Sequence, residues 1–236
     1  MIDNNDFINF IFIKKNSFVI VSFLKSNFLC VYKNEQILND YDENLIKDEF
    51  KKFLDNNIFK IEKVNKQFLR DINLVIYDNN FLSVNIGFKK NILGKFIFEK
   101  EILNLLSKIK NEIELNYKEL SIIHLLIDNK FVDGEDFNLK MKDNLKVCKY
   151  FSIETTFILF PLLRIFDYQN VFADYQMFVN KIISGEYVSK LAELENISES
   201  DMALKIFLGK NINEVVMFSK KAENKGFFKK FFHLFG

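Results

Sequence analysis

The sequence predicts a mixed fold of the α/β or α+β class, with strands and helices packed in layers. Short β-rich apolar runs alternate along the chain with longer segments of helical spacing. The final residues, 226–236, separate apolar from basic side chains as an amphipathic helix does. The apolar fraction of 49% is enough for a core, which excludes a wholly disordered chain.

The first part of the chain predicts an antiparallel meander, a helix and two further strands. The meander consists of three short apolar runs that are separated by short polar segments. The helix follows from apolar residues that recur every three or four positions. The predicted elements are strands at 7–13, 18–24 and 28–32, a helix over 45–54 that continues or restarts to 68, and strands at 71–77 and 81–88.

The second part continues the alternation of helices and strands. Asp133 and Gly134 predict a tight turn, and Pro161 is expected to open a helix at its first position. Ser198 with Asp201 resembles a capping box. The predicted elements are a helix over 98–115, strands at 121–127 and 146–159, a helix from 161, a strand at 177–183, and helices over 185–194 and 198–207.

The C-terminal stretch 226–236 carries the clearest functional signal. On a helix, at about 100° per residue, its apolar side chains fall within one arc of roughly 160°, opposite its basic side chains. Residues 220–236 hold five lysines and one glutamate, a net charge of +4. This pattern is typical of a helix that anchors a protein to an anionic membrane surface. The predicted membrane-binding residues are Phe227, Phe228, Phe231, Phe232, Leu234, Phe235, Lys225, Lys229 and Lys230.

A second interpretation of this stretch is a helix that docks on a partner protein or on the core of its own chain. The linker-like residues 220–226 that precede it favour the membrane.

Several classes of function are excluded or disfavoured by composition. The net charge of +1 and the presence of only two arginines argue against nucleic-acid binding. Two cysteines and two histidines exclude a multi-cysteine or histidine-rich metal site. We expect His124, which lies in an apolar run, to be a buried structural residue, and the acidic residues 133–136 to form a solvated turn. With no phosphate-loop or nucleophile motif, we expect no enzyme activity and no cofactor.

The sequence also predicts a compartment. Asp3 and Asp6 stand where a secretory leader would carry basic residues, and no apolar run of about 18 residues occurs. The two cysteines fit a reducing cytoplasm.

Three stretches resemble the FtsA family of actin-like bacterial cell-division proteins. Residues 36–76 resemble the segment that leads out of the first meander of that family, and 99–135 resemble the helix and strand of its inserted subdomain. His124 and Val132-Asp133-Gly134 match the family string of that strand residue by residue. The third stretch is the polar spacer and amphipathic helix at the end of the chain, which is similar to the membrane tether of the family.

The resemblance implies a partial actin-like lobe at 1–88, an inserted FtsA-type subdomain at 89–194, a linker with a possible short helix at 195–225, and the membrane-targeting helix at 226–236. The sequence departs from the family at the nucleotide motifs. The first phosphate loop of the family contains Asp, Gly and Thr, whereas the corresponding turn here is Ile13-Lys-Lys-Asn-Ser17. The second phosphate loop and the Gly-Gly adenosine motif are also missing. The resemblance therefore implies a reduced relative that binds no nucleotide.

Taken together, these features predict a non-catalytic, membrane-tethered scaffold of the bacterial cell-division machinery, on the cytoplasmic face of the cell membrane. Its expected partners are an anionic membrane surface and cell-division proteins or further copies of the chain, and not nucleic acid. The alternative is a soluble protein-interaction module whose C-terminal helix docks on a partner or on its own core.

Overall fold

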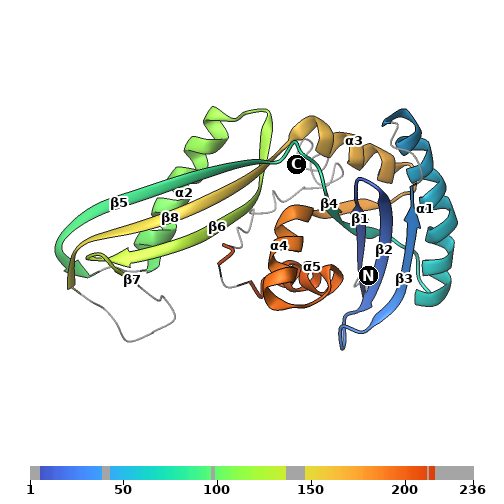
Figure 1. Ribbon diagram of the computed structural model, residues 1–236, viewed down its shortest axis with the longest axis horizontal. Helices are drawn as coiled ribbons and strands as arrows, with labels where there is room; N and C mark the ends of the chain where they lie inside the picture. Colours follow the sequence, from blue (N-terminus) through green and yellow to red (C-terminus); the bar gives the residue numbers. More distant parts are fainter. Residues whose placement is uncertain (1–5, 39–42, 97–98, 137–146, 212, 216–236) are drawn as a thin grey trace, which may run out of the picture.

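The computed structural model describes residues 6–38, 43–96, 99–136, 147–211 and 213–215. Within them lie two β-sheets and five helices, so the predicted mixed α+β class is confirmed. Figure 1 shows the two sheets side by side, the second one extending away from the first.

The first sheet has five strands in the order β3-β2-β1-β4-β9. Strands β1 and β2 form the predicted antiparallel hairpin, and β3 adds to β2. Strands β4 and β9 run parallel to β1, on its other side. The bounds are β1 Phe7–Ile13, β2 Ser17–Leu24, β3 Cys30–Ile37, β4 Asp71–Ile76 and β9 Phe178–Ser184.

Helices cover both faces of this sheet, which explains its nearly continuous apolar strands. Along β1, Phe10 and Phe12 belong to one core cluster, whereas Ile11 and Ile13 belong to the other. One cluster is closed by α4 (Gly185–Glu195) and α5 (Glu199–Phe207), and the other by α1 (Glu43–Asn65) and α3 (Leu162–Ala173). The buried apolar side chains of β1 therefore pack in two clusters, one on each face of the sheet.

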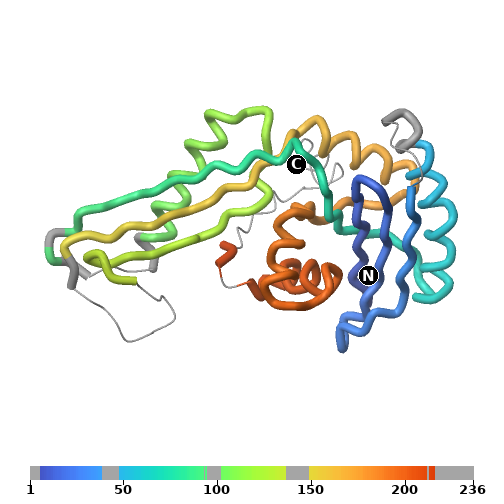
Figure 2. The backbone as a smooth tube through the Cα atoms, viewed as in Figure 1, coloured from blue at the N-terminus to red at the C-terminus, as the bar shows by residue number. Residues whose placement is uncertain are grey.

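The second sheet is antiparallel, with the strand order β5-β8-β6-β7. Helix α2 (Glu99–Asn116) packs against this sheet through a third apolar cluster. Figure 2 shows that β5, β8 and β6 run side by side away from the first sheet. The bounds are β5 Leu82–Phe96, β6 Leu120–Val132, β7 Glu135–Asp136 and β8 Val147–Pro161.

The second sheet spans 82–161, whereas the inserted subdomain was predicted at 89–194. Residues 162–194, expected in the inserted subdomain, form α3, β9 and most of α4. These elements belong to the first unit, which consists of the first sheet with helices α1, α3, α4 and α5. Strand β9 pairs with β4, and this pairing was not visible in the sequence because the two strands lie about a hundred residues apart. The expected linker at 195–225 contains α5, whose Met202 and Ile206 are buried in the core.

The strand lengths also differ from the prediction. Strands β3, β5 and β6 run beyond the predicted 28–32, 81–88 and 121–127, because polar residues on their solvent faces interrupt the apolar pattern without ending the pairing.

The turn predicted at 133–134 and the cap predicted at Ser198 are confirmed. Asp133 and Gly134 both have positive φ, 51° and 89°, as the predicted tight turn requires. Ser198 caps α5 by accepting a hydrogen bond from the Asp201 amide, at 3.1 Å. Pro161 was expected at the first position of a helix, but it is the N-cap of α3, one position before the helix begins, and also the last residue of β8. Among the described residues, no helix has the length and hydrophobicity to cross a bilayer.

Candidate functional site

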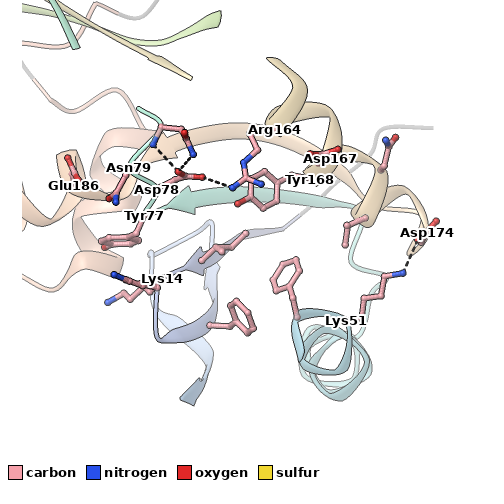
Figure 3. Close-up of a pocket in the computed structure, with 17 residues that line it drawn as sticks. Lys14, Lys51, Tyr77, Asp78, Asn79, Arg164, Asp167, Tyr168, Asp174 and Glu186 are labelled. Atoms are coloured by element: carbon pink, nitrogen blue, oxygen red, sulfur yellow. Dashed lines mark hydrogen bonds and ion pairs between the residues drawn. The ribbon is translucent and has the colours of Figure 1, made fainter. Parts of the chain in front are cut away.

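An open cleft of about 910 Å³ lies where the parallel strands of the first sheet end. Strand β1 ends at Ile13 and leads to Lys14, strand β4 leads to Tyr77, and β9 leads to α4. Helices α1 and α3 complete its walls (Figure 3). The carboxyl ends of parallel strands are where open sheets of this kind bind ligands, so this cleft is the candidate site.

The inner wall of the cleft is largely apolar. Phe18 of β2 and Phe50 of α1 pack together in a tilted arrangement, with ring centroids 4.9 Å apart. Val171 and Tyr168 of α3 add to this wall. The apolar wall gives the cleft a surface that a peptide or another low-polarity group could cover.

The lysine of the β1–β2 turn is tied to helix α5. The Lys14 ammonium donates to the Glu199 carboxylate at 2.5 Å and lies 5.2 Å from the centroid of the Tyr77 ring. The Ser189 hydroxyl donates to the other oxygen of Glu199, also at 2.5 Å. Burial by itself would raise the pKa of Glu199, but hydrogen bonds from Lys14, Ser189 and Tyr77 bring this pKa below its ordinary value. Lys14 is thus held by a partner within the protein and not presented freely to the cleft.

The acidic residue after β4 is also engaged within the protein. The carboxylate of Asp78 accepts hydrogen bonds from the amide and the side chain of Asn80, at 2.9 and 2.6 Å. Its second oxygen lies 3.5 Å from the Arg164 guanidinium. Figure 3 shows these contacts at the end of β4, between the loop and α3. On the opposite wall, Lys51 and Asp174 form a longer ion pair of 3.9 Å.

Tyr77 fills the space between the end of β4 and the start of α4. A methyl group on Gly185 would lie 2.5 Å from the Tyr77 Cγ atom, so only glycine fits at this position with the ring in place. Burial raises the pKa of Tyr77 well above its ordinary value, so the phenol stays neutral.

The described residues that line the cleft include no serine, cysteine or histidine. Two ion pairs lie within this lining, Arg164 with Asp78 and Lys51 with Asp174. Sequence reasoning did not assign this site, since its residues come from separate stretches of the chain. The only local signal was the pair Lys14-Lys15 directly after an apolar strand.

The sequence-predicted membrane-binding residues, Lys225 to Phe235, lie outside the described residues, and their role stays a prediction. His124 is fully buried, as predicted, and both ring nitrogens are hydrogen-bonded. In the acidic turn, Glu135 and Asp136 are exposed, and the Asp133 carboxylate accepts from the amides of Lys149 and Tyr150. Within the described ranges, no cluster of three or more metal-ligating side chains occurs.

No protein-family model matches this sequence, and no curated protein matches it either. Solved structures do match, with low identity. The cytoplasmic domain of EpsL, an inner membrane component of the type II secretion system of Vibrio cholerae, is 6% identical with a TM-score of 0.33; the match covers 75% of this chain and 55% of that one. A PilM–PilN type IV pilus biogenesis complex gives 8% identity, a TM-score of 0.43, and coverage of 79% and 51%.

A third match is a Bacteroides thetaiotaomicron protein of unknown function with an actin-like ATPase fold, which is the fold that the sequence resemblance implies. Its identity is 14% and its TM-score 0.33, over 81% of this chain and 59% of that one. The chain therefore spans between about half and three fifths of the length of these three structures. All three TM-scores lie below 0.5, so these likenesses carry no argument about ligands or partners.

Proposed function

We propose that this chain is a non-catalytic scaffold, tethered to the cytoplasmic face of the cell membrane by residues 226–236, in the manner of the FtsA family that its sequence resembles. Its partners would be anionic lipid at the tether, and cell-division proteins or further copies of the chain at the body. The cleft of the first unit would serve protein contacts and not nucleotide turnover.

The observation that carries this proposal is the state of the charged groups in the cleft. A phosphate-binding loop presents free backbone N–H groups and a free cation to its ligand. Here the Lys14 amide donates within the hairpin to the Ser17 carbonyl, at 3.0 Å, and the Lys14 ammonium is bound to Glu199. The Tyr77 ring packs against Gly185 at the same end of the sheet. These contacts support the proposal that the cleft does not bind the nucleotide that an actin-like family would imply.

The first experiment tests the cleft. The full chain is heated with and without ATP and Mg²⁺, and its melting temperature is followed by intrinsic tyrosine fluorescence or by circular dichroism. We expect no stabilisation at millimolar nucleotide, because a ligand stabilises only a folded state that binds it. A clear concentration-dependent rise in melting temperature would contradict the scaffold proposal and favour a nucleotide-binding protein.

The second experiment tests the tether by co-sedimentation with vesicles that contain or lack anionic lipid. We expect binding that requires anionic lipid and is lost in the Phe231→Glu, Phe232→Glu double variant. The matched control is Ala222→Glu, Asn224→Glu, which adds the same charge upstream of the predicted helix and should retain most of the binding. Equal loss in both variants would point to simple charge repulsion, and no binding by the wild-type chain would remove the tether.

The second candidate function is a soluble module whose C-terminal helix docks on a partner protein or on its own core. Two backbone hydrogen bonds of residues 213–215, upstream of that stretch, favour it. The Val215 amide donates to the Leu125 carbonyl at 2.9 Å, and the Ile127 amide donates to the Asn213 carbonyl at 2.8 Å. The last described residues thus pair with the edge of β6. If this candidate holds, deletion of 226–236 will lower the stability of the fold or abolish one protein contact without changing vesicle binding.

A further inference from the structure

The buried histidine of β6 lies where the two sheets meet. The side chain of His124 is fully buried, and its Nδ1 atom lies 2.8 Å from a carboxylate oxygen of Glu214. Its Nε2 atom accepts a hydrogen bond of 3.0 Å from the backbone amide of Ser184, where β9 ends and α4 begins. The Tyr187 ring of α4 packs against the imidazole, with ring centroids 4.7 Å apart. One imidazole ring therefore connects β6 of the second sheet with the β9–α4 corner of the first unit.

The hydrogen bonds determine the tautomer of this ring. A backbone amide can only donate, so the Nε2 atom that accepts from Ser184 carries no proton. The remaining proton then lies on Nδ1 and is donated to Glu214. His124 is thus a neutral imidazole in this arrangement. A second proton would have to be added at Nε2, where it would face the Ser184 N–H group at a nitrogen–nitrogen distance of 3.0 Å.

Charged and titratable groups approach the ring from several elements. Glu214 comes from the C-terminal segment, and its carboxylate is nearly buried, with 7% of the side chain exposed. Lys181 of β9 places its ammonium 3.8 Å from this carboxylate. Tyr187 comes from α4, and its hydroxyl accepts a hydrogen bond from Asn211. On β8, the residue paired with His124 is the apolar Ile158.

These surroundings favour the neutral ring. Burial lowers the pKa of His124, the hydrogen bond and charge of Glu214 oppose this shift, and the charge of Lys181 adds to it. Since the pKa is lowered in the folded state, the stability that the neutral ring provides is complete above about pH 6.5 and is lost as the pH falls below this value.

We propose that His124 is a pH-sensitive joint between the two sheets. In its neutral form it holds the β9–α4 corner through Ser184. Protonation at Nε2 replaces the acceptor by a donor, which breaks the bond to Ser184 and strengthens the pairing with Glu214. The ring then stays with Glu214 and β6, and the second sheet loses its His124–Ser184 link to the β9–α4 corner.

This mechanism makes a selective prediction about three amides. Ser184 should lose its protection when His124 is protonated. The amides of Ile127 and Val215 should keep theirs, because they pair β6 with the C-terminal segment and lie on the same side of the break as the ring. A general loosening of the fold would expose all three amides together.

The experiment is NMR on the ¹⁵N-labelled full chain between about pH 7.5 and pH 5. Imidazole ¹⁵N shifts report the tautomer and the titration, and the signals of His233 are identified with a His233→Gln variant. Amide exchange is converted to protection factors, which removes the intrinsic effect of pH. We expect the Nδ1–H tautomer at the higher pH, and at least about a tenfold fall in the Ser184 protection factor as His124 titrates, with Ile127 and Val215 changing less than about twofold.

Any of three results would overturn this proposal. The first is an Nε2–H tautomer at the higher pH, and the second is a Ser184 amide that stays protected after His124 is protonated. The third is a ring that stays neutral until the whole chain unfolds. A His124→Gln variant, which can still accept from the Ser184 amide but cannot titrate, provides the second test. Its Ser184 protection should not depend on pH. If this variant does not fold, the wild-type titration decides alone.

Discussion

The close contact between Gly185 and the Tyr77 ring, which lines the cleft, can be tested by substitution. We consider Gly185→Ala. Gly185 is the first residue of α4, and a Cβ atom there would lie 2.5 Å from Cγ and 2.6 Å from Cε2 of Tyr77. The Cγ atom is near the backbone, so rotation of the ring about its own axis cannot relieve the contact, and the ring or the helix start must shift.

Two opposing terms set the magnitude. Alanine in place of glycine favours a helix by up to about 1 kcal/mol. Overpacking of a filled site costs about 1–3 kcal/mol, and here the clash involves the fixed part of an aromatic ring. We therefore expect Gly185→Ala to lower the free energy of unfolding by about 1–2 kcal/mol. In a Tyr77→Ala background the clash is absent, and the same substitution should be neutral or stabilising.

The assay is urea unfolding of the two single variants and the double variant, with ΔG taken from the midpoint and the slope. The matched control is Gly87→Ala in β5, where a Cβ atom would meet no heavy atom within 4 Å. A change of sign between the two backgrounds is the expected result. If Gly185→Ala costs the same with and without the Tyr77 ring, or costs nothing in the wild-type chain, the interpretation of this contact is wrong.

Three further predictions concern stability. Glu199→Gln should remove the ion pair with Lys14 and lower the free energy of unfolding by less than about 1 kcal/mol near neutral pH. Because the pKa of Glu199 is lowered on folding, this difference from the wild type should shrink as the pH drops below about 4.3. Urea midpoints measured across this pH range test it. Asn57→Ala should cost about 1–3 kcal/mol, since this buried amide accepts two side-chain hydrogen bonds and donates a third, whereas the exposed neighbour Asn56→Ala should change the urea midpoint little. Ser198→Ala should cost about 1 kcal/mol by removing the cap of α5, measured by the same unfolding assay.

Much of the element order was predictable, because each helix and most strands carry their own periodicity. Strand β1 is apolar on both faces and reads as a strand by itself. Which strands pair with which was harder to predict from the sequence. The pairing of β9 with β4 depends on the insertion of a whole sheet between them, and no local pattern marks the point where the chain returns to the first sheet.

The side-chain contacts of the cleft and of His124 could not be predicted from the sequence either, because they join residues far apart in the chain. The apolar run around His124 predicted a buried ring, but its partner Glu214 lies 90 residues away in a stretch that the sequence marked only as a linker. The cleft combines residues of two turns and three helices, and none of these residues forms a motif by itself. Such sites become visible only when the topology brings the segments together.

The second sheet has a mechanical consequence. Strands β5 and β8 pair from Leu82 and Leu159, beside the first unit, to Phe96 and Val147 at the far end. At about 3.3 Å per residue along β8, this ladder is roughly 40 Å long. A rotation of about 10° where it joins the first unit would move its tip by about 7 Å, so a small change at this junction would shift any surface that the tip contacts.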